Sequence, residues 1–85
     1  MRNTYSFTLT AKCPVDGSQD VYQVAVISNR MVPVESILVA SRELTIHPDY
    51  QEALCQRLAT ELKSRVEMIG VHSGVVVKTK CGDVA

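Results

Sequence analysis

Apolar and polar residues alternate along the N-terminal part of the chain in two runs that are typical of strands. From Tyr5 to Ala11 the odd positions are apolar and the even positions polar, which predicts a half-buried strand. The second run, Val21 to Ser28, is apolar on both faces at its centre. A connection of about eight residues joins them and contains Pro14, Asp16 and Gly17, so the two strands are expected to pair antiparallel.

The middle of the chain changes to helical spacing. Ser36 can cap a short helix from about Ile37 to Leu44, whose apolar residues fall on one side. A longer helix is predicted from Pro48 or Asp49 to about Arg65, because proline suits the first helical position and acidic residues suit the first turn. Apolar residues recur with helical spacing in this second helix and predict a buried stripe: Tyr50, Leu54, Leu58 and Leu62.

Two further strands follow, Val66 to Val71 and Val75 to Lys80, and the tight connection His72-Ser73-Gly74 makes them a predicted hairpin. The order strand, strand, helix, helix, strand, strand predicts an α+β domain with one four-stranded antiparallel sheet and both helices on one face. The 85 residues suit a single domain, residues 1–85. His72 is expected to be a solvated turn residue, with a proton donor as the alternative.

The second face of the predicted sheet has no cover within the chain. Val24 to Ile27 and Val75 to Val77 offer apolar side chains to both faces, and the helices can cover only one of them. Exposed apolar sheet surface and unpaired edges favour association. We therefore expect a homo-oligomer in which sheets of several subunits join edge to edge into a barrel, with ligand sites between subunits.

Charge and composition argue against several classes of partner. Nine basic residues balance nine acidic ones, and no basic run is interleaved with aromatic residues, so direct nucleic-acid binding is not expected. No apolar stretch approaches the roughly 20 residues of a membrane span, and the N-terminus has no apolar signal core. We expect a cytoplasmic protein with no membrane contact.

The cysteines and histidines do not indicate a disulfide framework or a metal site. A catalytic zinc normally has three protein ligands, and Cys13, His47 and His72 do not form a spaced motif, so no metal is expected. Cys55 lies among apolar residues of the second predicted helix and is expected in the core. Cys81 is expected to be a free surface thiol.

The candidate chemistry lies in Cys13-Pro14-Val15-Asp16-Gly17-Ser18-Gln19-Asp20, where a thiol on a turn precedes a carboxylate by seven residues. A thiolate can attack an electrophilic carbon, and a nearby acid can protonate the product. The same residues also suit a half-buried structural cysteine and an ordinary turn aspartate. The spacing alone leaves both interpretations open.

The element order resembles the tunnelling fold, whose oligomeric barrels bind purines and pterins between subunits. Within that group, roughly Thr8 to Lys80 is most similar to the nitrile reductases of queuosine biosynthesis, which reduce 7-cyano-7-deazaguanine. Their loop reads Cys-Pro-x-Thr-Gly-x-Pro-Asp, and the cysteine, first proline, glycine and final aspartate match here at the same spacing. Val34-Glu35-Ser36 resembles their Val-Glu-Ser, and Tyr50-Gln51-Glu52 resembles their Phe-His-Glu.

The resemblance implies roles for five residues. Cys13 is expected to add to the nitrile carbon and form a covalent thioimide, and Asp20 to protonate the nitrile nitrogen. Glu52 is expected to accept hydrogen bonds from the guanine-like edge of the deazapurine, and Glu35 and Ser36 to take part in substrate binding. Glu52 also suits a favourable interaction with the helix macrodipole, and its residue type alone leaves that alternative open.

The chain departs from the reductases at their cofactor motif. Their Glu-Ser-Lys-Ser-Leu-Lys is Glu35-Ser36-Ile37-Leu38-Val39-Ala40 here, without either lysine. Lysines supply positive charge for a cofactor phosphate, so NADPH is a candidate cofactor that lacks its usual motif. A related branch, which forms archaeosine, makes the same thioimide and uses ammonia to give an amidine without NADPH. The missing lysines favour that branch.

Three functions fit these residues. The first is a 7-deazaguanine enzyme that converts the nitrile to an amidine or amine through Cys13, in queuosine- or archaeosine-type tRNA modification. The second is a pterin- or purine-binding enzyme of the same fold, such as an aldolase or epimerase, in which Glu52 matters and Cys13 is incidental. The third is a non-catalytic oligomeric binding protein. Blocking Cys13 distinguishes the first from the other two.

Overall fold

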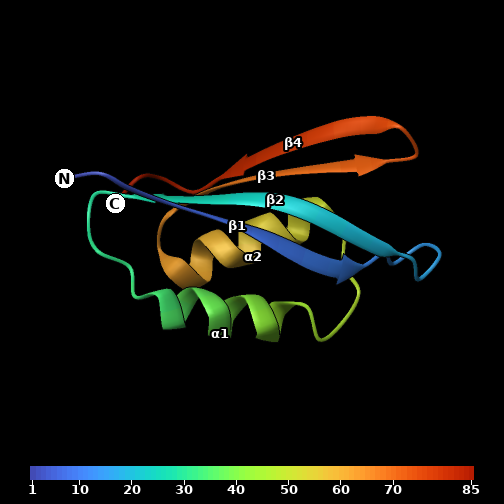
Figure 1. Cartoon of the computed structure of the whole chain (residues 1–85), viewed down its shortest axis with the longest axis horizontal. Helices are drawn as coiled ribbons and strands as arrows, with labels where there is room; N and C mark the ends of the chain where they lie inside the picture. The colour runs from blue at the N-terminus through green and yellow to red at the C-terminus, as the bar shows by residue number, and fades with distance from the viewer.

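Two β-hairpins with two helices between them make up the computed structural model, which describes all 85 residues (Figure 1). The strands are β1 (Asn3–Lys12), β2 (Gln19–Ser28), β3 (Arg65–His72) and β4 (Val75–Cys81), and the helices are α1 (Val34–Leu44) and α2 (Gln51–Leu62). The strands form one antiparallel sheet in the order β1-β2-β3-β4, with both helices on one face. The predicted α+β class, element order and helix placement are confirmed.

The core lies between the sheet and the helices. Side chains alternate between the two faces of a strand, and the β1–β2 register places the pairs Phe7–Val24 and Leu9–Tyr22 on the helix side. The buried apolar residues form one cluster: Leu9, Ala11, Tyr22, Val24, Val26, Val32, Ile37, Ala40, Leu44, Leu54, Cys55, Leu58, Ala59, Leu62, Val66 and Met68. The predicted burial of Cys55 is confirmed, whereas Cys81 is half-buried and packs against this cluster instead of lying free on the surface.

The start of α1 differs from the sequence-based expectation. The helix begins at Val34, directly after Pro33, and no side chain caps it. Ser36 lies inside the first turn, so its predicted role as the cap is wrong. Pro33 supplies the non-helical residue that precedes the helix, with φ −59° and ψ 132°.

Both ends of α2 also differ. The helix begins at Gln51 and ends at Leu62, inside the predicted limits. Lys63 ends it by adopting the left-handed conformation, with φ 49°, and the chain then enters β3. Tyr50 was expected in the buried stripe, but it precedes the helix in an extended conformation and is 60 % exposed. The remaining leucines of the stripe are buried as predicted.

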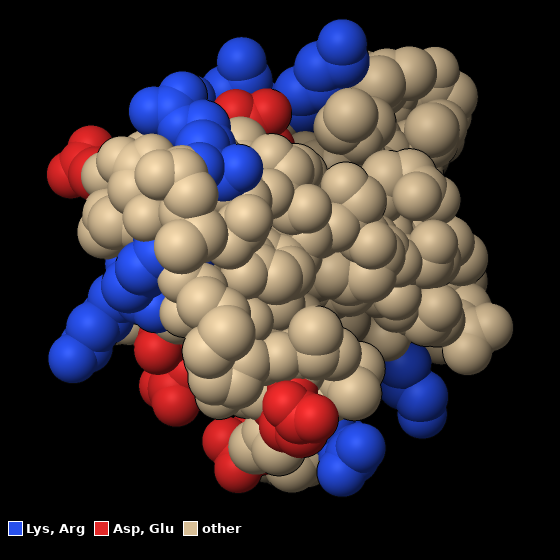
Figure 2. Space-filling model, turned by 60° about the vertical axis from the view of Figure 1, so that its left-hand side comes forward, with Lys and Arg blue, Asp and Glu red and all other residues tan.

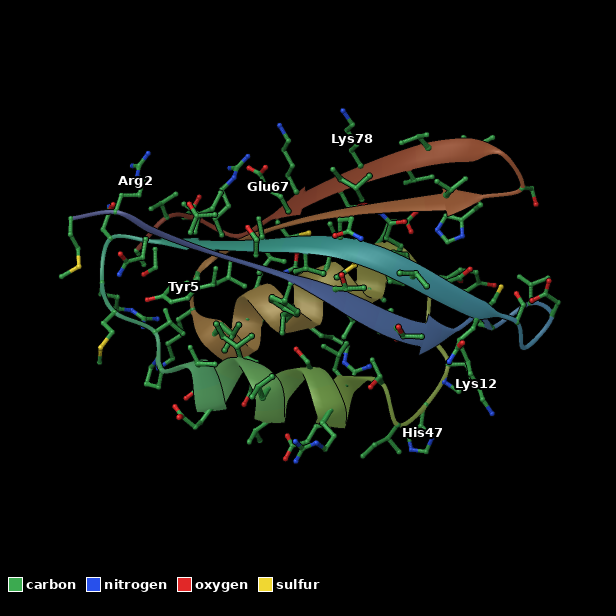
Figure 3. The ribbon with its side chains drawn as sticks, viewed as in Figure 1. Arg2, Tyr5, Lys12, His47, Glu67 and Lys78 are labelled. Atoms are coloured by element: carbon green, nitrogen blue, oxygen red, sulfur yellow. The ribbon has the colours of Figure 1, made fainter.

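The outer face of the sheet carries apolar side chains that no element of the chain covers. Val21, Val71 and Val76 are each more than half exposed, and Val71 pairs directly with Val76 across the β3–β4 hairpin. Figure 3 shows Glu67 and Lys78 pointing away from the helices on this side, whereas Tyr5 points toward them and accepts the Val32 N–H at 2.9 Å. The uncovered second face is therefore present. The oligomeric barrel that it suggests stays a prediction.

Charged side chains are interspersed rather than segregated. On the face shown in Figure 2, lysine and arginine lie close to aspartate and glutamate, and no large patch has a single sign. This distribution agrees with the zero formal net charge of the chain. None of the helices is long and apolar enough to span a membrane.

The two hairpins diverge toward the end of the sheet that holds the β1–β2 loop (Figure 1). Pairing between β2 and β3 stops at Gln23–Ile69, although both strands continue beyond it. Gly70 lies at the point of divergence and makes room for two side chains. A Cβ there would lie 2.5 Å from Tyr22 Cε1 and 2.8 Å from Gln51 Oε1. The absence of a side chain at this position thus allows both residues to lie between the hairpins.

Gly70→Ala is expected to lower the free energy of unfolding by about 1–3 kcal/mol, the usual cost of adding atoms to a filled core. The added methyl group meets the Tyr22 ring, so Tyr22→Leu in the same chain should recover part of the loss. Urea unfolding of the two single variants and the double variant measures this coupling. If the double variant lost as much free energy of unfolding as the two single variants together, the added methyl group would not clash with the Tyr22 ring.

Candidate active site

The β1–β2 loop holds Cys13 through its own hydrogen bonds. The Cys13 N–H donates to Ser18 O at 2.7 Å, and the Gly17 N–H donates to Cys13 O at 2.9 Å. Gly17 has a φ of 74°, which glycine adopts without steric cost. Asp16 Oδ1 accepts the Ser18 hydroxyl at 2.6 Å and the Ser18 N–H at 2.9 Å, and these bonds lower the pKa of Asp16. Cys13 is therefore half-buried at a defined position just after β1.

This loop forms one wall of a cleft of about 580 Å³, a size that suits a small organic molecule. β2, the β3–β4 hairpin and the N-terminal end of α2 form the other walls. The lining includes three residues that the sequence predicted, Cys13, Asp20 and Glu52. Residues far apart in the sequence thus meet at one cleft, with a thiol, a half-buried carboxylate and an exposed carboxylate.

Glu35 and Ser36 do not lie at this cleft. Both are exposed in the first turn of α1 and line a separate shallow depression with Glu61. That turn lies toward the end of the molecule where the chain termini meet, whereas the β1–β2 loop lies at the other end (Figure 1). Within one chain these two residues and Cys13 are not brought together. Their expected part in substrate binding requires a neighbouring subunit and stays a prediction.

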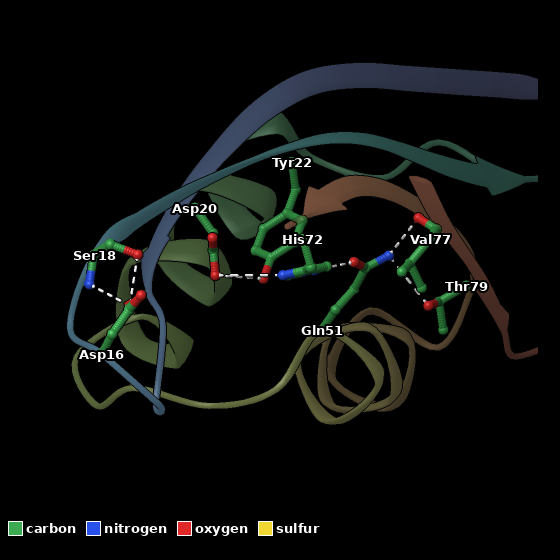
Figure 4. A network of polar contacts seen from close by, with 8 residues as sticks. All are labelled: Asp16, Ser18, Asp20, Tyr22, Gln51, His72, Val77 and Thr79. Atoms are coloured by element: carbon green, nitrogen blue, oxygen red, sulfur yellow. Dashed lines mark hydrogen bonds and ion pairs between the residues drawn. The ribbon is translucent and has the colours of Figure 1, made fainter. Parts of the chain in front are cut away.

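Gln51 lies beneath the cleft, 2 % exposed, with hydrogen bonds on both sides of its amide (Figure 4). The two hydrogens of Nε2 are shared among three acceptors, Met68 O at 3.0 Å, Val77 O at 2.9 Å and Thr79 Oγ1 at 3.2 Å. Oε1 lies 2.8 Å from His72 Nε2. Because the two carbonyl oxygens can only accept hydrogen bonds, they fix the amide nitrogen on the β3–β4 side and the amide oxygen toward His72.

His72 lies at the end of β3 and not in the turn, and its side chain is 34 % exposed. The expectation of a solvated turn residue is therefore wrong. Ser73 and Gly74 form the turn with φ values of 50° and 81°, so the strand continues through His72. Its position has the same parity as Met68, so the alternation of β3 turns the ring toward the helix side. This parity was the signal in the sequence that could have located His72.

Asp20 joins the other side of this network. Its Oδ2 accepts the Tyr22 hydroxyl at 3.3 Å and lies 3.9 Å from His72 Nδ1 (Figure 4). The Tyr22 and His72 rings are tilted against each other with their centroids 5.8 Å apart. Burial, and then the Asp20 carboxylate, raise the pKa of Tyr22 to about 12. Tyr22 therefore keeps its proton at neutral pH and remains a donor to Asp20.

The cleft carries more acidic than basic groups. Its lining includes Asp16, Asp20, Asp49 and Glu52, while His72 is its one basic side chain and neither lysine nor arginine is present. Carboxylates suit a ligand with several N–H donors better than they suit a phosphate. No group of three histidine, cysteine, aspartate or glutamate side chains is arranged to hold a metal ion.

Comparison with known proteins identifies one similar fold. No protein-family model matches the chain, and no curated protein matches it in sequence. The crystal structure of the archaeosine synthase QueF-like in its apo form matches with a TM-score of 0.81 at 14 % sequence identity, over 99 % of this chain and 94 % of that chain. At this identity the likeness establishes the fold alone. It confirms the tunnelling fold that the sequence predicts.

Proposed function

We propose that this protein binds 7-cyano-7-deazaguanine and forms a covalent thioimide through Cys13, as an enzyme of 7-deazaguanine metabolism in tRNA modification. The observation that carries the proposal is the meeting of Cys13, Asp20 and Glu52 at one cleft. Each of the three occupies a position at which the sequence resembles the nitrile-acting family. The fold shared with an archaeosine synthase adds independent support.

The chemistry requires a nucleophile and an acid. The Cys13 thiolate forms a bond from Sγ to the nitrile carbon, one π bond of the nitrile breaks, and the nitrogen takes a proton from Asp20. Negative charge would otherwise build up on that nitrogen, so an acid at the cleft lowers the barrier. The Asp20 side chain is only 15 % exposed, which limits competition from water.

Recognition of the base is assigned to the start of α2. Glu52 lies in the first turn of this helix and lines the cleft. A carboxylate accepts two parallel N–H donors of a guanine-like edge, and charge-assisted hydrogen bonds are stronger than neutral ones. Apolar surface for the flat ring is available from Val77 and the exposed Tyr50 ring, which line the same cleft.

Glu52→Gln is expected to weaken binding of 7-cyano-7-deazaguanine about 10- to 100-fold, the range that follows from losing a hydrogen bond to a charged group. Titration calorimetry in a Cys13→Ala background measures this affinity without interference from covalent attachment. The matched control is Glu43→Gln, an exposed position at the end of α1 that lines neither the cleft nor the depression with Glu35 and Ser36. Equal affinity of both variants would remove Glu52 from the site.

Ammonia is the favoured second substrate. Its attack on the thioimide carbon expels the Cys13 thiolate, and the surplus proton returns to the site, which leaves an amidine and the free thiol. The acidic lining of the cleft, without lysine or arginine, suits a small neutral nucleophile better than the phosphates of NADPH.

The reaction product tests this function. The protein is incubated with 7-cyano-7-deazaguanine and either an ammonium salt or NADPH, and the small molecules are separated and weighed by mass spectrometry. The proposal predicts the amidine with ammonium. The amine with NADPH alone would assign the protein to the reductases, and an unchanged nitrile in both reactions would contradict an enzyme of this class.

A further inference from the structure

We infer that His72 is a positioning residue that supplies, through Asp20, the proton which the nitrile nitrogen takes, and that Gln51 determines which ring nitrogen of His72 gives up that proton. This inference rests on the proposed function. It concerns His72 at the end of β3, for which the sequence left a proton donor as the alternative, and Gln51 on the buried side of α2, which the sequence did not assign to the site.

The tautomer of His72 follows from the hydrogen bonds of Gln51. The Gln51 amide nitrogen is held by Met68 O and Val77 O, which are acceptors only, so its Oε1 must face His72 Nε2, at 2.8 Å. An amide oxygen can only accept, so Nε2 of the ring carries the hydrogen. In the neutral ring the lone pair is then on Nδ1, and in the cation the additional proton is on Nδ1.

Nδ1 is also the ring atom that faces Asp20, with 3.9 Å between Nδ1 and Oδ2. As Sγ of Cys13 bonds to the nitrile carbon, the Nδ1 proton of the His72 cation passes to the Asp20 carboxylate, and Asp20 passes a proton to the nitrile nitrogen, once Nδ1 and Oδ2 have closed from 3.9 Å to hydrogen-bond distance. His72 is left as the neutral Nε2–H form that Gln51 stabilises, and Asp20 as the carboxylate. The Cys13 thiol loses its own proton to solvent before the attack. The later attack of ammonia on the thioimide releases a proton, which returns to His72.

Among the side chains that line the cleft, His72 is the one that can carry a proton as a cation near Asp20. The other titratable groups of the cleft are Tyr22 from β2, Cys13 and Asp16 from the β1–β2 loop, and Asp49, Tyr50 and Glu52 around the start of α2. β4 contributes only Val77 to the lining. The four carboxylates and the hydroxyl groups carry no positive charge in any protonation state, so none of them can replace the ring as a cationic proton donor.

The test uses the pH dependence of adduct formation. His72→Gln can still donate an amide N–H to Gln51 Oε1 but cannot titrate, and His47→Gln makes the same change on an exposed loop. Adduct formation is followed by intact mass over a range of pH for both variants and the unmodified chain. For His72→Gln we expect a rate about 10- to 100-fold lower near neutral pH. As the pH rises, the rate for His72→Gln should begin to fall at a pH at least about one unit lower than for the unmodified chain, because a carboxyl group ordinarily titrates well below an imidazole. His47→Gln should match the unmodified chain.

The outcomes separate this inference from the proposed function. No adduct in the unmodified chain removes both. An adduct whose pH profile has the same shape in His72→Gln, even at a lower rate, leaves His72 as a structural residue and overturns the inference alone. An independent readout is the ¹⁵N spectrum of the histidine side chains, which should show the Nε2–H tautomer for neutral His72. The Nδ1–H tautomer would overturn the inference whatever the kinetics.

Discussion

Cys13→Ala is expected to abolish covalent attachment of 7-cyano-7-deazaguanine, because its Sγ is the one thiol that lines the cleft. The loss should be complete within the sensitivity of intact mass measurement, since alanine offers no nucleophile. Non-covalent affinity should change little, because the base is held by Glu52 and by apolar lining. The effect is measured by denaturing the protein after incubation and weighing it.

The other two cysteines provide matched controls. Cys55 is fully buried, and burial raises the pKa of its thiol to about 12, so it is neutral and unreactive at neutral pH. Cys81 packs against the core at the end of β4 and does not line the cleft. Cys55→Ala and Cys81→Ala should therefore keep the adduct. Loss of the adduct in either of these, with retention in Cys13→Ala, would contradict the assignment of the nucleophile.

Asp20→Asn is expected to slow adduct formation by about 10²- to 10⁴-fold, the range typical of removing a general acid. Asparagine has the same shape, and its side-chain oxygen can still accept the Tyr22 hydroxyl, but it has no carboxyl proton to deliver. Affinity for the ligand should therefore stay within a few-fold of the unmodified chain. Stopped reactions weighed at successive times give the rate, and titration in a Cys13→Ala background gives the affinity.

The matched control for this variant is Asp83→Asn, which removes an equal charge at an exposed position outside the cleft. It should leave the rate unchanged. If Asp20→Asn formed the adduct as fast as the unmodified chain, another group would have to protonate the nitrogen. The roles assigned to Asp20 and to His72 would then both fail.

The order and type of the elements could be predicted from local sequence patterns, because the apolar residues of each strand or helix recur with the period of that structure. Leu9 and Ala11 alternate with polar residues, and both are buried where the period of two places them. The helix ends were predicted less accurately, since they depend on backbone conformations that residue type does not determine. Lys63 ends α2 in a left-handed conformation that glycine or asparagine more often adopts, so its residue type did not indicate the end of the helix.

Only those residues of the site that belong to short sequence motifs could be predicted from the sequence. Cys13 and Asp20 lie on one loop and its adjoining strand, so their proximity follows from a hairpin alone. The Gln51–His72 hydrogen bond joins residues 21 positions apart, from a helix and a strand. It forms only because β3 extends to His72 and because Gly70 leaves space between them. Such a contact depends on packing, which residue spacing does not specify.

Glu35 and Ser36 illustrate a different limit. Their sequence context suggests substrate binding, yet within one chain they lie in the first turn of α1, away from the cleft. If the chain assembles through its uncovered sheet and open edges, a neighbouring subunit can bring this turn to the cleft. The role of both residues therefore depends on the assembly and not on the fold of the single chain.

The decisive experiment is the intact mass of the unmodified protein after incubation with 7-cyano-7-deazaguanine, recorded under denaturing conditions. We predict a species heavier by one complete ligand, because thioimide formation is an addition and nothing leaves. Fragmentation should place the added mass on the peptide that contains Cys13. An unchanged mass at concentrations of protein and ligand that saturate a weak site would contradict nitrile chemistry at this cleft.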